Sequence, residues 1–242
     1  MPASIGVLAG MGPRSTAPFV DMLIQACQDL YDARNDMDFP KMHIISLPTP
    51  FYPGIPVIDR DMANALKRGI AELVKVGVDL IVVPCNLAHV YFTAMIEASK
   101  DIPLLHIADC ALRRLPAQIT HVAIIGAAPT LESGIYQHRI RAKGKVVVNT
   151  IRLQELATEL ISLVKERGFI DKQVENTWRK VLSEAKQGNA DAILVACTDI
   201  SPLITEDQSL VIIDAAVSLA EAAVHASYSS HCQILTLTGS VT

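Results

Sequence analysis

The sequence is poor in charged and aromatic side chains, and it lacks a long uninterrupted apolar run. Charged residues make up 19% and aromatic residues 5% of its 242 positions, and the formal net charge is −4. Without a basic stripe or aromatics on which bases can stack, we expect no nucleic-acid partner. The best candidate for a membrane span, residues 211–228, is interrupted by Asp214, Glu221 and His225. We therefore expect no membrane segment.

Paired cysteines and several common motifs are also missing. The five cysteines are an odd number and no Cys-x-x-Cys pair occurs, so a disulfide framework is not expected and the thiols suit a cytoplasmic location. No Lys or Arg precedes the apolar run that begins at Ile5, which is not the layout of a secretory signal peptide. The sequence contains no P-loop, no Gly-x-Ser-x-Gly motif and no zincin motif, which argues against the enzyme classes that depend on them.

Half of the residues are apolar, and they form short runs that alternate with helical patterns. Alternation of this kind predicts an α/β fold with parallel sheets. The expected strands cover residues 4–10, 42–47, 80–83, 102–107, 122–126, 145–149, 192–195 and 210–213. The order of elements restarts near residue 120, which predicts two similar halves. We assign residues 1–115 and 210–242 to the first domain and 116–209 to the second; the tail 229–242 shows no clear pattern.

One stretch occurs twice and ends on a cysteine each time. Residues 77–89 carry an apolar run to Cys85, and residues 189–199 carry a similar run to Cys197. Ligands of open parallel sheets bind outside the carboxyl ends of the strands, so we expect both thiols in a cleft between the two halves. A thiol on each side of a substrate carbon can remove a proton from one face and return one to the other.

Both thiols are expected to be activated by a helix N-terminus. Free N–H groups and the helix dipole stabilise a thiolate, and a modest decrease from the usual cysteine pKa of about 8.5 makes the thiol a usable base. The remaining cysteines fit the ordinary role of a small buried apolar side chain: Cys27, Cys110 and Cys232.

A metal site is the rival interpretation of the same cysteines. Cys85 and His89 are spaced i and i+4, but Cys197 has no histidine nearby. Zinc usually takes three or four good ligands, so we expect no metal.

Several polar groups are candidates for binding a small carboxylate. Asn86, Thr130 and Thr198 follow expected strands, where their side chains and the backbone N–H groups can hold developing negative charge. The turn at residues 10–12 is an incomplete dinucleotide fingerprint without its third glycine; a turn that presents N–H groups to a carboxylate fits it better. Arg60 and Lys165 are candidate cations, although a solvated surface charge is the more frequent state of either residue type.

Four segments together give the chain a specific resemblance. They are residues 10–16 (GMGPRST), 84–89 (PCNLAH), 130–136 (TLESGIY) and 196–199 (ACTD). In this order and spacing they resemble the aspartate/glutamate racemase superfamily, in particular its aspartate racemases and broad-specificity amino-acid racemases. The resemblance implies two Rossmann-like parallel-sheet halves related by a pseudo-twofold axis, an active site between them, and a homodimer.

The same resemblance implies racemisation of an amino acid without pyridoxal phosphate or another cofactor. Cys85 and Cys197 would be the acid–base pair. The residues implied to contact the substrate are Met11, Gly12, Asn86, Thr130, Ser133 and Thr198, with Arg60 and Lys165 for a side-chain carboxylate.

Three departures from the family pattern bear on the substrate. Leu87 stands where the first motif usually has threonine, and a lost donor in a buried polar site costs about 1–3 kcal/mol. Asp199 replaces the usual glutamate, and Arg60 lies farther from the Ile55-Pro56 pair than in aspartate racemases. Two alternatives therefore stay open: a decarboxylase or isomerase of small dicarboxylates from the same superfamily, although such decarboxylases keep a single cysteine, and a non-catalytic amino-acid-binding protein.

Overall fold

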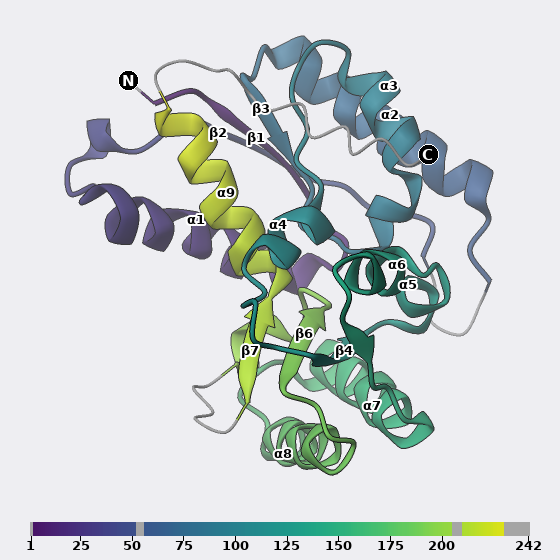
Figure 1. The fold of residues 1–242 in the computed structure, drawn as a ribbon. Helices are drawn as coiled ribbons and strands as arrows, with labels where there is room; N and C mark the ends of the chain where they lie inside the picture. The colour runs from purple at the N-terminus through teal and green to yellow at the C-terminus, as the bar shows by residue number, and fades with distance from the viewer. Residues whose placement is uncertain (1, 52–55, 205–209, 230–242) are drawn as a thin grey trace.

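The computed structural model describes residues 2–51, 56–204 and 210–229, and it contains two parallel sheets (Figure 1). The first sheet has the strand order β2-β1-β3 and the second the order β5-β4-β6-β7. The strands of the first sheet are β1 (Ile5–Ala9), β2 (Met42–Ser46) and β3 (Leu80–Val82). Those of the second are β4 (His121–Gly126), β5 (Val146–Val147), β6 (Ala192–Ala196) and β7 (Val211–Asp214). The α/β class and the two sheets are as expected from the sequence.

Helices cover both faces of each sheet. With the first sheet lie α1 (Thr16–Tyr31), α2 (Asp59–Val76), α3 (Phe92–Ser99), α4 (Ile107–Arg113) and α9 (Ala215–Tyr228). With the second lie α5 (Ala128–Glu132), α6 (Ile135–Ala142), α7 (Ile151–Arg167) and α8 (Lys172–Gln187). Short 3-10 turns occupy Pro13–Ser15, Asp36–Asp38, Leu87–Tyr91 and Ser201–Leu203. No helix of the described residues is long and apolar enough to cross a membrane.

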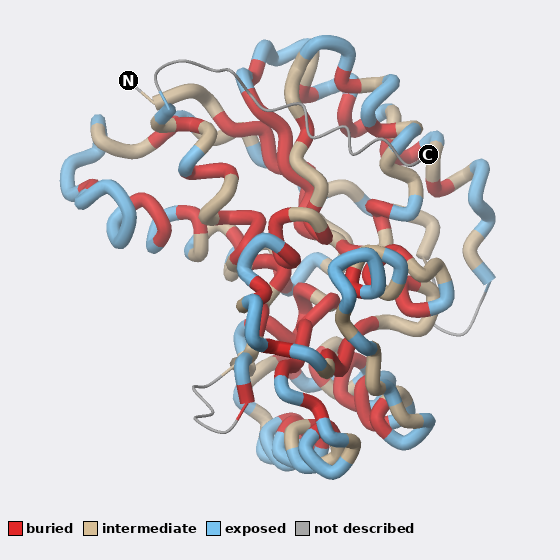
Figure 2. Tube along the Cα trace, in the orientation of Figure 1, coloured by how far each residue is buried: buried red, intermediate tan, exposed pale blue. Residues whose placement is uncertain are grey.

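Strand β1 shows why the central strands read as continuous apolar runs. Its five residues are all buried, because successive side chains point to opposite faces of the sheet and both faces are covered. Ile5 and Val7 pack in the cluster that contains α1 and α9, whereas Leu8 packs with α2 and α3. Figure 2 shows the same pattern, with buried residues along the strands and exposed residues on the outer sides of the helices.

One buried cluster connects the two halves. It contains Ile5 and Val7 of β1 together with Val122 of β4 and Leu194 of β6, and side chains of α4 and α9 lie in it as well. The other face of the second sheet packs separately against α7 and α8. A shared apolar core of this kind holds the strand ends of both halves in a defined relative position.

The expected strand at residues 102–107 is wrong. Only an isolated parallel bridge forms there, between Ile81 and Leu104. Pro103 has no N–H to donate, so it cannot extend a ladder, and the His106 side chain already caps α4 by accepting a hydrogen bond from the Ala108 N–H at 3.2 Å. The helix expected at residues 133–142 begins at Ile135, because Gly134 adopts a φ of 72° and separates it from the short helix α5 before it.

Strand β7 lies in the second sheet, where it pairs with β6, and not in the first domain as expected. Helix α9 directly after it packs against α1 and α4. The chain therefore returns to the first half between β7 and α9, and we propose that the domain boundary lies there, near residue 214. The tail at 230–242 lies outside the described residues.

Candidate active site

A cavity of about 730 Å³ lies where the turns after β1, β3, β4 and β6 meet. Both cysteines singled out from the sequence line it, and so do Met11, Gly12, Asn86, Thr130, Thr198 and Lys165. Its walls come from both halves of the chain. The cavity is therefore at the carboxyl ends of two parallel sheets, the usual place for a ligand in such folds.

The Cys85 thiol follows β3 and faces the cavity from the first half. The N–H groups of Leu87 and Ala88 at the start of the 3-10 turn hydrogen-bond to it and lower its pKa, but burial outweighs them and raises the pKa to about 11. The expected decrease in the Cys85 pKa is therefore wrong. The free-energy cost of removing a thiolate from water is larger here than the stabilisation that two N–H hydrogen bonds give it.

Cys197 follows β6 and faces the cavity from the second half. Burial and the neighbouring Asp199 carboxylate raise its pKa well above the usual range, and the Asp199 N–H acts in the opposite direction. Negative charge on Cys85 also raises the pKa of Cys197. The raised pKa of both groups favours the neutral thiol over the thiolate.

Three buried polar side chains stand beside the thiols. Asn86 Oδ1 accepts a hydrogen bond from the buried Tyr136 hydroxyl, while its Nδ2 is buried without a partner among the described residues. Thr198 donates to Ser15 Oγ at 3.3 Å. Thr130 is buried in the cavity wall. An amide donor that is already desolvated and unpaired is suited to donate a hydrogen bond to a substrate carboxylate.

The turn after β1 requires glycine for steric reasons. Gly10 has a φ of 93°, and a Cβ at this position would lie 2.5 Å from the Leu47 backbone nitrogen. A Cβ on Gly12 would lie 3.2 Å from both Asp199 carboxylate oxygens. The turn thus passes close to the Asp199 carboxylate in the cavity wall.

Two of the residues expected to contact the substrate lie elsewhere. The Arg60 side chain is 82% exposed and pairs with Asp61 at 3.1 Å, and Arg60 is not among the described residues that line the cavity. Ser133 does not line it either; its hydroxyl donates to the Thr130 carbonyl at 2.7 Å. Arg60 points to solvent because it lies in the first turn of α2 on the face opposite the buried Met62, as the helical period requires.

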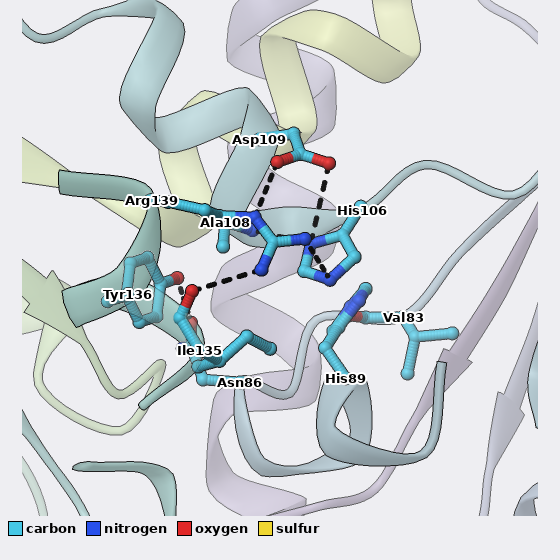
Figure 3. A network of polar contacts seen from close by, with 9 residues as sticks. All are labelled: Val83, Asn86, His89, His106, Ala108, Asp109, Ile135, Tyr136 and Arg139. Carbon is cyan, nitrogen blue, oxygen red and sulfur yellow. Dashed lines mark hydrogen bonds and ion pairs between the residues drawn. The ribbon is translucent and has the colours of Figure 1, made fainter. Parts of the chain in front are cut away.

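A polar network behind Asn86 was not predicted from the sequence (Figure 3). Arg139 donates from Nε to Asp109 at 2.7 Å, and its Nη2 lies 3.2 Å from His106 Nε2. Burial lowers the pKa of His106 to about 3 and that of His89 well below its usual value, so both rings are neutral. Arg139 lies 30 and 33 positions from Asp109 and His106, and none of these three residues falls in the four segments that carry the resemblance.

His89 belongs to this network and does not line the cavity among the described residues. Its Nε2 lies 2.9 Å from the Val83 carbonyl oxygen, and its ring lies 4.9 Å from that of His106. The described residues contain no group of three or more His, Cys, Asp or Glu side chains placed to hold a metal ion. A 3-10 turn, not an α-helix, follows Cys85, so the i and i+4 spacing does not place the Cys85 and His89 side chains on one helix face.

Comparison with known proteins is consistent with this architecture. Residues 8–224 match the family described as Asp/Glu/Hydantoin racemase. The chain is 38% identical over 221 residues to the broad specificity amino-acid racemase RacX of Bacillus subtilis (strain 168), covering 91% of this chain and 96% of that protein. The structure of Picrophilus torridus aspartate racemase is 25% identical, with a TM-score of 0.77 and coverage of 93% and 94%. An aspartate racemase homologue from Pyrococcus horikoshii OT3 shares the fold at 20% identity, with a TM-score of 0.74 and coverage of 93% and 99%.

Proposed function

The chain belongs to the Asp/Glu/hydantoin racemase family and is an amino-acid racemase of that family, and from this premise we propose that Cys85 and Cys197 are its two acid–base groups. The observation that carries the proposal is that two free thiols, from corresponding positions of two repeated units, line one cavity. Inversion at a carbon atom requires proton removal on one face and proton delivery on the other.

The reaction needs one thiolate and one thiol. The thiolate takes the α-proton, and the electron pair left on Cα is delocalised into the substrate carboxylate. The second thiol then delivers its proton to the opposite face and becomes the thiolate. The reverse direction uses the two cysteines in exchanged roles, so both enantiomers can be substrates and no net redox change occurs.

The surrounding donors supply the second requirement, which is stabilisation of the carbanion. We propose that the substrate carboxylate is bound by the unpaired Asn86 amide, by the hydroxyls of Thr130 and Thr198, and by the backbone of the turn at Met11 and Gly12. Hydrogen bonds to a carboxylate strengthen as negative charge develops on it, and in a water-excluded site each can contribute several kcal/mol to the transition state.

Because burial raises the pKa of both thiols, the substrate itself can contribute to their activation. A positive charge next to a thiol favours the thiolate, and the ammonium group of the amino acid brings such a charge into the cavity. We infer that a thiolate forms in the complex and not in the free enzyme. A homodimer and a cytoplasmic location stay predictions; light scattering of the purified protein tests the first.

Solvent exchange in deuterated water tests the assignment of two bases. Single enantiomers of a panel of amino acids are incubated with the enzyme, without added pyridoxal phosphate or metal, and followed by NMR and chiral chromatography. We expect early product to carry deuterium at Cα while the remaining substrate stays protiated, because each enantiomer exchanges with a different thiol. If deuterium enters the unreacted substrate as fast as the substrate is inverted, the two-base mechanism is contradicted. Binding without any exchange would indicate an amino-acid-binding protein.

A further inference from the structure

The cavity holds one lysine and two carboxylates among its described lining residues. They are Lys165 from α7, Asp199 after β6, and Glu132 at the exposed end of α5. No other lysine or arginine lines it among the described residues, and the undescribed ranges 52–55, 205–209 and 230–242 contain neither residue type. The charged groups among the described lining residues therefore sum to −1.

Lys165 already has a counter-ion within the protein. Its Nζ lies 3.8 Å from Asp199 Oδ2 and 5.0 Å from the centre of the Phe51 ring. The Asp199 side chain is only 6% exposed, whereas that of Lys165 is 34% exposed. A buried carboxylate depends on its cation because an uncompensated charge in this environment is strongly unfavourable.

We infer that the site takes amino acids whose side chains carry no carboxylate, and that Asp199 determines this preference by pairing with Lys165. The inference rests on the proposed function, because it concerns the side-chain end of the same site. A substrate with a side-chain carboxylate must draw Lys165 away from Asp199 or lie unpaired beside it. Because Lys165 is the one lysine or arginine among the described lining residues, either arrangement leaves Asp199 or the side-chain carboxylate without a lysine partner, and like charges in an interface are penalised.

The rest of the wall agrees with this substrate class. Apolar side chains of Phe51, Met62, Leu87 and Ile161 line the cavity. Arg60, the second cation that the sequence suggested for an acidic side chain, points away from it. An uncharged alkyl or amide chain finds apolar surface here, and a carboxylate finds no free cation among the described lining residues.

Isosteric substrate pairs provide the sharpest test. Asn against Asp and Gln against Glu differ in side-chain charge and hardly in shape. For the wild-type enzyme at pH 7.5 we expect kcat/KM to favour the amide of each pair by about tenfold or more. A ratio measured within one enzyme preparation is insensitive to losses of overall activity.

Three substitutions separate the contributions of Asp199, Lys165 and Glu132 to this preference. Asp199→Asn frees Lys165, and the amide-to-acid ratio should fall by about tenfold or more. Lys165→Met removes the cation, and the ratio should stay at or above that of the wild type. Glu132→Gln removes an equal charge from the cavity without touching the pair, so the ratio should change less than in Asp199→Asn.

Calorimetric titration with the same four amino acids measures the preference without turnover. If no amino acid is racemised but Asn and Gln bind more tightly than Asp and Glu, the proposed function is wrong and the inference stands. If the wild type favours the acids in kcat/KM and in Kd, or if Asp199→Asn leaves both ratios unchanged, the inference is wrong whether or not the protein is active.

Discussion

The two halves of the chain place their cysteines alike but surround them differently. Asp79 and Asp191 each accept hydrogen bonds from the start of the neighbouring central strand, Ser4 in one half and Thr120 in the other. One residue after the cysteine stands Asn86 or Thr198, and two residues after it stand the apolar Leu87 or the charged Asp199. The backbone units are thus repeated, while the groups near the thiols are not.

The polar neighbour of each thiol is held by the opposite half. Tyr136 of the second half donates to Asn86 of the first, and Thr198 of the second half donates to Ser15 of the first. Each binding group therefore depends on how the halves meet. The repeated fold thus supplies two equivalent positions for acid–base groups, whereas contacts between the repeats decide what each position can bind.

Replacing each cysteine in turn gives the largest expected effect. Cys85→Ser and Cys197→Ser should each lower racemisation by about 10²–10⁴-fold, the usual contribution of a positioned acid–base group. Each variant should still exchange the α-proton of one enantiomer, and the two variants should act on opposite enantiomers. NMR in deuterated water measures both effects. Exchange of the same enantiomer in both variants would contradict the equivalence of the two positions.

Cys110→Ser is the matched control. This cysteine is buried on α4 and does not line the cavity among the described residues. Racemisation should survive in this variant, provided that circular dichroism shows a folded protein.

The contacts between the halves give the next largest effect. Tyr136→Phe removes the hydroxyl that holds Asn86, and an unsatisfied buried acceptor costs about 1–3 kcal/mol, so kcat/KM should fall by about tenfold to a hundredfold. Ser15→Ala removes the weaker 3.3 Å contact to Thr198, and the decrease should be smaller. Steady-state kinetics with both enantiomers measures these changes.

Thermal unfolding separates positioning from general stability in these two variants. If Tyr136 positions Asn86, kcat/KM should fall in Tyr136→Phe samples that remain fully folded at the assay temperature. A loss of activity that only follows the loss of folded protein, or a larger effect of Ser15→Ala, would argue against the role of the cross-half contacts.

The two strand-end carboxylates give the smallest expected effect, which is on stability. Asp191 accepts from two N–H groups and one hydroxyl, at 2.7–3.0 Å, whereas Asp79 accepts from one of each, at 2.7–2.8 Å. Asp191→Ala should therefore lower Tm more than Asp79→Ala at pH 7. Scanning calorimetry measures the difference, with the exposed Asp21→Ala on α1 as a control for the removed charge.

The pH dependence of the same variants has a defined sign. Hydrogen bonds lower the pKa of Asp79 and of Asp191 in the folded protein, so each carboxylate stabilises the fold above its unfolded pKa of about 4. That contribution is lost as the pH falls toward the folded pKa. The Tm differences from wild type should shrink below about pH 4; differences that grow in acid would contradict the assignment.

Local patterns in the sequence were sufficient for some features and not for others. The apolar run before Cys85 and its copy before Cys197 predicted two buried strands with thiols at their ends, and both lie in one cavity. Pro103 interrupted a third apolar run, and the strand predicted there is a single bridge. Arg60 was a candidate cation from its residue type and a looser spacing, and its position on α2 directs it to solvent.

The sequence by itself determined the α/β class, the repeat and the position of the two cysteines, because hydrophobic period, turn residues and a common offset are local properties. Only the tertiary structure decided how those groups behave. Burial raised the pKa of both thiols where helix N–H groups alone suggested the reverse. The contacts of Lys165 with Asp199 and of Tyr136 with Asn86 join residues 34 and 50 positions apart. The first pair forms only when the second half folds and the second only when the two halves meet, since desolvation and charge pairing depend on distance in space and not on distance along the chain.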